Sequence, residues 1–293
     1  MNYFLVADIG GTKLATALFT NEGILIGSKE VKSENKDGEL LFKKLVESFE
    51  MLLAVEGLSF DKIGGIGIGV PGIVDPNAGI AIYQNNLPWR DFPLKQRLQN
   101  IFPDTKISID NDVYMATYGE FVARSFTVET FVYVTVSTGI SCCTISEGKF
   151  IRGAGMAGEI GFSLTSQSGH TLEASVAGPI LEKNGRVAFN DPQLSLKDMM
   201  LRYYEGDLRA TSIVGEAVVA LAKEIFHILL FVDPTCIVIG GGVFNNHPSL
   251  LEAVRLELRQ YLNHPLLEGK EKRIEASIYK GNAGLQGAFA RCR

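Results

Sequence analysis

The sequence predicts a duplicated α/β fold, in which each half of the chain opens with β-hairpins and continues with alternating strands and helices. Two observations favour this fold. Pairs of apolar, β-branched runs are joined by tight turns at Gly10-Gly11 and again at Thr138-Gly139. After each pair, strand-like runs alternate with segments in which apolar residues recur at helical spacing.

In the first half, Gly23 turns the chain from the first hairpin into a third strand, and Pro71-Gly72 ends a buried strand that is diluted by glycine. The helices follow from apolar residues that repeat on one face. The expected strands cover 4–8, 14–19, 24–31, 63–70 and 106–109, and the expected helices cover 41–53, a short segment after Pro93, and 113–123.

The second half repeats this order of hairpins followed by strands and helices. The expected strands cover 131–136, 142–146, 236–239 and 274–278. The expected helices are one that begins at Glu173, two that cover 212–231 and 250–262, and a last one that begins near Ala283. We expect two domains, a smaller N-terminal one formed by 1–112 with 282–293 and a larger C-terminal one formed by 113–281.

Composition excludes several classes of protein. The net charge of −5, with no cluster of Lys or Arg on one face, argues against nucleic-acid binding. The longest apolar stretch, 225–232, is too short to span a membrane, and the N-terminal residues lack the pattern of a signal peptide. The four cysteines lie in apolar surroundings typical of core packing. We therefore expect a cytoplasmic protein without a membrane partner.

The two glycine turns are candidate phosphate sites. Their amides can approach phosphate oxygens without an intervening side chain, and Thr12, Lys13 and Thr138 add hydroxyl and ammonium donors. Paired turns of this kind suit a phosphoryl-transfer enzyme, which acts mainly by positioning and charge stabilisation. Either turn alone is explained equally well as an ordinary hairpin.

Asp112 is the candidate catalytic base. It follows an apolar strand at the point where a helix begins, and ligands of open α/β sheets lie at the carboxyl ends of strands. A carboxylate there can accept the proton of an attacking hydroxyl. A helix N-cap explains Asp110, Asn111 or Asp112 as well, but only one of the three residues can be the cap.

Other polar residues are candidates for binding a polyol or a nucleotide. Glu159, Glu173 and Asn86 can hydrogen-bond the hydroxyls of a sugar, although loop and turn chemistry explains them too. Gly240-Gly241-Gly242 leaves room for an adenine ring or a phosphate, or forms a tight strand-to-helix turn. The four scattered histidines have no Cys partners at zinc-ligand spacing, which argues against a structural zinc site.

These residues together resemble the ROK family of sugar kinases and related regulators, and the resemblance runs almost end to end. The motifs that carry it are Asp8-Ile9-Gly10-Gly11-Thr12-Lys13, Gly69-Val70-Pro71-Gly72, Asn86-Leu87-Pro88-Trp89, Asn111-Asp112, Thr138-Gly139-Ile140, Gly158-Glu159-Ile160-Gly161 and Ile239-Gly240-Gly241-Gly242. The resemblance implies an actin-like ATPase (ribonuclease H-like) fold, with two α/β domains around a central cleft that holds ATP and a sugar.

The resemblance also implies roles for particular residues. Asp112 becomes the general base on a sugar hydroxyl, commonly the 6-hydroxyl, and the sugar is held by Gly72, Asn86, Asn111, Glu159 and Glu173. The nucleotide phosphates are held by Asp8, Gly10, Gly11, Thr12, Lys13, Thr138 and Gly139. Gly241 and Gly242 of the glycine triplet are further candidates for binding the nucleotide. Mg²⁺ accompanies ATP close to Asp8.

The chain departs from the family pattern at the zinc motif. Family members commonly carry a His after Gly-Glu-Ile-Gly, where this chain has Phe162, and a Cys-rich run where it has Ser168-Gly169-His170-Thr171. No structural zinc is therefore expected, as in the zinc-free branch that includes β-glucoside kinases. The second phosphate turn also carries less glycine than usual.

The sequence thus predicts an ATP-dependent kinase for a hexose or hexoside, similar to glucokinase. A β-glucoside kinase and an N-acylhexosamine kinase are alternatives, and a homodimer is plausible by resemblance. A regulator would need a DNA-binding segment before the first strand, for which the sequence leaves no room. A sugar-binding protein without catalytic activity is the remaining alternative, because the second phosphate turn is degraded.

Overall fold

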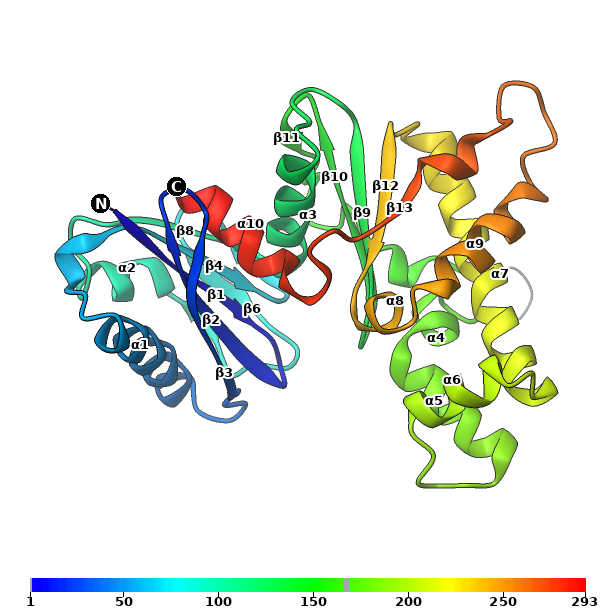
Figure 1. The fold of residues 1–293 in the computed structure, drawn as a ribbon, viewed down its shortest axis with the longest axis horizontal. Helices are drawn as coiled ribbons and strands as arrows, with labels where there is room; N and C mark the ends of the chain where they lie inside the picture. The colour runs from blue at the N-terminus through cyan, green and yellow to red at the C-terminus, as the bar shows by residue number, and fades with distance from the viewer. Residues whose placement is uncertain (1, 166–168) are drawn as a thin grey trace. The chain divides into compact units, whose positions relative to one another are not determined.

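The computed structural model describes residues 2–165 and 169–293 (Figure 1). Internal contacts divide the chain into unit 1, formed by Met1–Phe126 with Asn282–Arg293, and unit 2, formed by Thr127–Gly281. The first boundary follows Phe126 rather than Asp112. The reason is that the helix after Asp112 packs against the helix after Asn282, and so belongs to unit 1.

Unit 1 is built on a five-stranded sheet of order β3-β2-β1-β4-β8. Strands β1, β2 and β3 form an antiparallel meander, whereas β1, β4 and β8 are parallel. The carboxyl ends of these three parallel strands therefore share one edge of the sheet. The strands are β1 (Tyr3–Ile9), β2 (Lys13–Thr20), β3 (Leu25–Lys32), β4 (Ile63–Val70) and β8 (Lys106–Asn111).

Helices cover both faces of the unit 1 sheet. In β1, Leu5 and Ala7 point to the same face of the sheet, because successive side chains of a strand alternate between its two faces. They pack in one apolar cluster with helices α1 (Gly38–Val55) and α2 (Leu94–Gln99). Their neighbour Val6 packs instead with helices α3 and α10. Figure 1 shows α1 and α2 on one side of this sheet and α10 on the other. The bounds of the latter pair are α3 (Asp112–Ala123) and α10 (Ala283–Cys292).

Two glycines let α3 and α10 cross at close range. A Cβ on Gly287 would overlap the carbonyl group of Met115, and one on Gly119 would lie 2.8 Å from the amide nitrogen of Gly287. We expect Gly287→Ala to lower the free energy of unfolding by about 1–3 kcal/mol, measured by chemical denaturation. Gly281→Ala is the control, because no atom lies within 4 Å of its added Cβ. Wild-type stability of Gly287→Ala would contradict the close crossing.

A small antiparallel sheet of order β5-β6-β7 lies outside the sequence-based expectation. Its strands β5 (Ile73–Asp75), β6 (Ile80–Tyr83) and β7 (Arg90–Phe92) are too short to show a period. Trp89, before β7, is 1% exposed and its indole nitrogen donates to the carbonyl of Gly38 at 2.9 Å. The tryptophan thereby ties this sheet to the start of α1.

Unit 2 repeats the topology of unit 1 strand by strand. Its sheet has the order β11-β10-β9-β12-β13, with an antiparallel meander followed by strands parallel to the first strand of the unit. This repetition confirms the predicted duplicated α/β fold. The strands are β9 (Phe131–Val136), β10 (Ile140–Ser146), β11 (Lys149–Phe150), β12 (Cys236–Gly240) and β13 (Ile274–Ala276).

The helices of unit 2 pack into one cluster with the apolar residues of β9 and β12. The longest of them begins after Asp207, whose carboxylate accepts from the amides of Arg209 and Ala210. The helices are α4 (Glu173–Val176), α5 (Gly178–Phe189), α6 (Leu196–Tyr204), α7 (Leu208–Phe231), α8 (Gly242–Asn246) and α9 (Ser249–Arg259), with 3₁₀ turns in the chain at Phe60–Lys62, Ile160–Phe162, Lys270–Arg273 and Lys280–Asn282. Helices α5 and α6 were not predicted from the sequence.

No helix in the described ranges combines the length and the apolar composition needed to cross a bilayer.

Candidate active site

Two carboxylates meet at the carboxyl edge of the unit 1 sheet. Asp8 in β1 pairs with Gly69 in β4, and Asp112 follows β8 at the same edge. A Cβ on Gly69 would lie 3.3 Å from the Cα of Asp112 and 3.5 Å from Oδ1 of Asp8. The glycine therefore leaves the space in which both acids lie, and any side chain there would separate them.

Asn111, and not Asp112, is the cap of helix α3. Its Oδ1 accepts from the amide of Val113 at 2.9 Å and from that of Tyr114 at 3.3 Å, while its Nδ2 donates to the carbonyl of Gly72 at 2.9 Å. Asp112 becomes the first helical residue, where the helix dipole favours a negative charge. This geometry decides the capping question that the sequence left open for Asp112.

Burial and the neighbouring acid both disfavour ionisation of Asp8. Its pKa is raised from 3.8 to about 7, first by burial and then by the charge of Asp112, while Lys13 acts in the opposite direction. The carboxylate also lies against α10, since a Cβ on Gly284 would be 2.6 Å from Oδ2 of Asp8. Two acids held together in this way fit a divalent cation, whose charge would relieve their repulsion.

The protein side of such a cation site is sparse. Within residues 2–165 and 169–293, no three His, Cys, Asp or Glu side chains come together as a complete metal site would require. A Mg²⁺ ion beside Asp8 would therefore take its remaining ligands from phosphate oxygens and water, which is how this ion is usually bound next to a nucleotide.

The first glycine turn is stabilised by hydrogen bonds, one of which comes from Ser33, a residue that the sequence analysis did not name. The amide of Gly10 donates to the carbonyl of Lys13 at 2.8 Å, and the hydroxyl of Ser33 donates to the carbonyl of Gly10 at 2.6 Å. A Cβ on Gly11 would lie 2.7 Å from the Cβ of Asn86. The structure thus brings Asn86 against the turn. Lys13 is exposed and pairs with a carboxylate of β3 rather than folding over the turn.

A buried glutamine, Gln84, lies beside Gly72 and was not named in the sequence analysis either. Gln84 is fully buried, and its Oε1 has no hydrogen-bond partner among the described residues. Its Cα would be 3.1 Å from a Cβ on Gly72, whose φ of +79° favours glycine. No pattern in the sequence marks Gln84, because its burial arises only when the small sheet folds over β8.

In unit 2, Glu173 joins the second glycine turn to the neighbouring acidic loop. Its Oε2 accepts from the amide of Ile140 at 3.1 Å, directly after the turn. A Cβ on Gly139 would overlap this oxygen, and one on Gly161 would lie 3.3 Å from it. Glycine at both positions therefore lets the Glu173 carboxylate reach the turn and the loop at once.

Glu159 lies in the same group of acids. Burial and the charge of Glu173 both raise the pKa of Glu159. The loop is anchored to β10, because the carbonyl of Gly158 accepts from the amide of Cys142 at 2.8 Å. The next side chain after the loop, Phe162, is 67% exposed. Ser168, named above in the altered zinc motif, lies outside the described residues.

A cavity of about 740 Å³ links the second turn to the glycine triplet. Gly241 has a φ of +84°, and a Cβ there would overlap the carbonyl of Val136, so the close approach of β9 and β12 needs glycine. The volume is typical of a site for a nucleotide-sized ligand. The lining includes Ser137, Thr138, Gly178, Glu182, Lys197, Gly242, Asn246 and His247.

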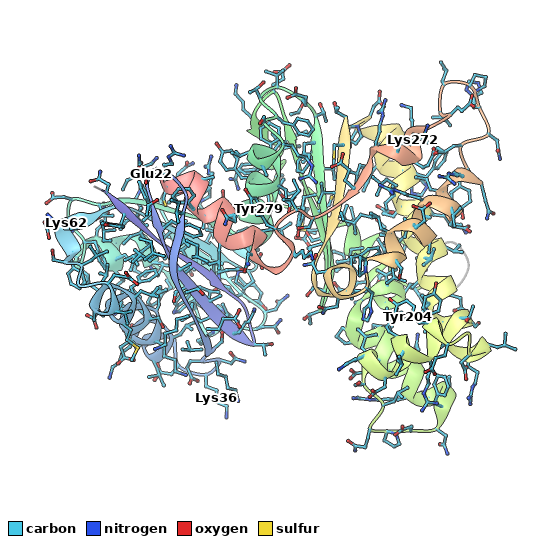
Figure 2. The ribbon with its side chains drawn as sticks, in the orientation of Figure 1. Glu22, Lys36, Lys62, Tyr204, Lys272 and Tyr279 are labelled. Carbon is cyan, nitrogen blue, oxygen red and sulfur yellow. The ribbon has the colours of Figure 1, made fainter. Side chains whose placement is uncertain are left out.

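One rim of this cavity is polar and was not predicted. Burial lowers the pKa of His247, and Nδ1 of that ring lies 3.1 Å from the hydroxyl of Tyr204. Figure 2 shows Tyr204 among the helices of unit 2. Helix α6 and the segment after α8 supply these two residues, and only the folded chain brings them together.

Nearly the whole chain matches known proteins in sequence. The ROK family model matches residues 5–293. Among curated relatives, the glucokinase of Halalkalibacterium halodurans is 26% identical over 97% of this chain and 93% of its own length, and the N-acetylmannosamine kinase of Salmonella typhi is 28% identical over 97% and 96%.

Solved structures show the same fold. A ROK family glucokinase from Streptomyces griseus, in complex with glucose and AMPPNP, superposes with a TM-score of 0.82 at 22% identity over 98% of each chain. A ROK family transcriptional regulator, a homologue of the E. coli MLC protein, superposes with a TM-score of 0.84 at 18% identity over 98% of this chain and 76% of its own. The fold is that of the actin-like ATPases, and the chain belongs to the ROK family.

Proposed function

We propose that this chain is an ATP-dependent sugar kinase, which transfers the γ-phosphate of ATP to a hydroxyl, the 6-hydroxyl in particular, of a hexose or hexoside. One observation carries the proposal. The half-buried carboxylate of Asp112 lies beside Asp8, at the sheet edge that also carries the Gly10-Gly11 turn. A base and a phosphate-binding turn in one unit are the parts that phosphoryl transfer requires.

In this proposal Asp112 accepts the proton of the sugar hydroxyl while the hydroxyl oxygen forms a bond to the γ-phosphorus and the bond to ADP breaks. Asn111 is held by its cap bonds and by Gly72, so its amide is fixed where it can orient the sugar. Glu159 and Glu173 would accept from further hydroxyls. Bound Mg²⁺ would neutralise phosphate charge next to Asp8.

Each unit, taken by itself, carries candidate groups for binding a nucleotide. Amides of the turn at Gly10, Gly11 and Thr12 would hold phosphate oxygens, as would the turn at Thr138-Gly139. The cavity bounded by Gly242 and His247 is of a size that suits the adenosine portion. Helix α8 begins at Gly242, and Gly242 and Val243 both line this cavity.

An ATP-coupled assay over a panel of hexoses, hexosides and N-acylhexosamines tests the proposal. We expect ADP release that depends on one of these sugars and on Mg²⁺. Sugar binding by calorimetry without any turnover would instead favour a protein that only binds sugar. Tight, sequence-specific DNA binding at physiological salt would favour a regulator.

The exposed phenyl ring of Phe162 leads to a narrower expectation about the substrate. A ring at this position offers apolar surface in place of the histidine that the family resemblance led us to expect, so a hexoside with a bulky anomeric group gains contact area. We expect a higher kcat/KM for a β-glucoside than for free glucose. Phe162→His should reduce that ratio about tenfold, since one apolar contact contributes roughly 1–3 kcal/mol to discrimination. A wild-type preference for glucose would contradict this assignment.

A further inference from the structure

Ser163 is bonded to the chain neighbours of both candidate sugar-binding acids of unit 2. Its amide donates to the carbonyl of Ile160 at 2.9 Å, and Ile160 directly follows Glu159. Its carbonyl accepts from the amide of Leu172 at 2.7 Å, and Leu172 directly precedes Glu173. Ile160, Ser163 and Leu172 thus form a junction, the Ser163 junction, between the two segments that carry the acids.

The acids themselves are open to a ligand, whereas one side of the junction is buried. Glu159 and Glu173 are exposed residues, but Leu172 is 1% exposed and belongs to the apolar cluster of unit 2. Burial and then the charge of Glu173 raise the pKa of Glu159, so the two carboxylates lie close enough to repel each other. Their separation therefore depends on how firmly the two segments are joined.

The side chain of Ser163 anchors the junction to helix α7. Its hydroxyl donates to Oε1 of Glu224 at 3.0 Å, and the Glu224 side chain is only 12% exposed. A hydrogen bond to a carboxylate is stronger than one between neutral groups, and little water competes for a carboxylate that is mostly buried. Helix α7 packs into the core of unit 2 and against α4, which begins at Glu173 (Figure 1). It therefore offers a rigid point of attachment.

Two further observations bring Glu224 to the same loop. A cavity of about 640 Å³ is lined by Gly158, Ser163 and Glu224 together with Cys142 of β10. Burial and then the charges of Glu224 and Glu159 raise the pKa of Cys142 to about 12. Both acids therefore lie close enough to this thiol for their charges to act on it, and the loop of Glu159 lies beside its anchor.

We infer that Ser163 is a positioning residue for the sugar, which fixes the separation of the Glu159 and Glu173 carboxylates and has Glu224 as its anchor. The inference rests on the proposed function, because it takes both acids to accept from sugar hydroxyls. Ser163 acts through these two acids. They bind the sugar before and during the reaction alike, so a loosened junction weakens sugar binding and leaves the proton transfer to Asp112 unchanged.

Removing the hydroxyl tests this role. We expect Ser163→Ala to raise the KM for the sugar about five- to tenfold, the fold-change that one typical hydrogen bond contributes. Its kcat and its KM for ATP should stay within about twofold of the wild-type values, because the base and the nucleotide groups are untouched. Ser163→Thr keeps a hydroxyl and should retain the wild-type KM. Ser212→Ala, which changes an exposed serine of α7, is the matched control and should also retain it.

A double-mutant cycle tests the anchor. Glu224→Ala should raise the sugar KM as much as Ser163→Ala does, and the double variant should be no worse than either single variant, because all three lack the same bond. Hydrogen exchange of the Leu172 amide should be faster in both single variants without any ligand, since this amide donates to Ser163. Additive effects on KM would overturn the assignment of Glu224 as the anchor.

Calorimetric sugar binding without ATP separates this inference from the proposed function. If the wild type binds a sugar and Ser163→Ala binds it equally tightly, the role of Ser163 is wrong and the proposed function stands. A lower kcat with an unchanged sugar KM would overturn the role as well. A wild type that binds no sugar and releases no ADP would overturn both. Ser163→Ala should keep the wild-type circular dichroism spectrum, because the backbone bonds of the junction do not need the hydroxyl.

Discussion

Replacing Asp112 with asparagine is expected to lower kcat by about two to four orders of magnitude. The amide keeps the size of the carboxylate but cannot accept the proton of the sugar hydroxyl. The fold should survive, because Asn111 caps α3. The amide of Val113 donates to Oδ1 of both Asn111 and Asp112, and the bond to Asn111 remains in the variant. A coupled ATP assay on the best sugar of the panel measures the loss.

The matched control is Asp104→Asn, an exposed acid in the same unit, which should retain the wild-type kcat. The sugar KM of Asp112→Asn should change much less than its kcat, because a base acts in the transition state more than in binding. Wild-type turnover by a folded Asp112→Asn protein would remove this residue from the role of base.

Asp8→Asn is expected to stabilise the nucleotide-free protein at pH 8 by up to about 4 kcal/mol, and to have no such effect at pH 4. The Asp8 pKa rises from 3.8 in the unfolded chain to about 7 in the folded one. Below pH 3.8 the Asp8 carboxyl is protonated in both the folded and the unfolded chain, so it does not lower the free energy of unfolding. Between the two values only the unfolded chain ionises, so the free energy of unfolding falls as the pH rises, and the loss is complete above pH 7.

Thermal or urea unfolding of both proteins across pH 4–8 measures the difference. Asp112→Asn provides an independent check, since its charge is the second cause of the raised Asp8 pKa. In that variant the decline of stability with pH should be shallower than in the wild type. Parallel profiles of stability against pH for all three proteins would show that the pKa of Asp8 is not raised in the folded chain.

Much of the fold could be predicted because strong local patterns coincide with its elements. The strand Ile63–Val70 and the strand Phe131–Val136 were expected with their observed bounds, since each is an apolar run closed by turn residues. The short strands β5, β6 and β7 were missed because three or four residues carry no period. The boundary after Phe126 was missed because it depends on packing between α3 and α10, which are far apart in the sequence.

The candidate site was predictable in its residue types but not in its arrangement. The glycine turns, the acid after β8 and the acid at the start of α4 can be read locally, and they identified Asp112 and Glu173 as candidates, whereas Asp8 became one through the family resemblance. Which of Asp110, Asn111 and Asp112 would cap the helix depends on backbone angles at the end of β8. Ser33 and Gln84 carry no local signal, because each acts on a partner more than ten positions away in the chain.

The position of α10 has a consequence for biosynthesis. Residues 283–292 pack against Phe4, Val6 and Phe19, so one face of the first sheet acquires its cover only after all of unit 2 has been translated. Until then, helix α3 alone can cover this face, and the part that α10 covers would stay exposed on the nascent chain. The N-terminal unit therefore completes its core only after the whole chain has been synthesised, whereas a domain that is continuous in sequence can fold as it emerges.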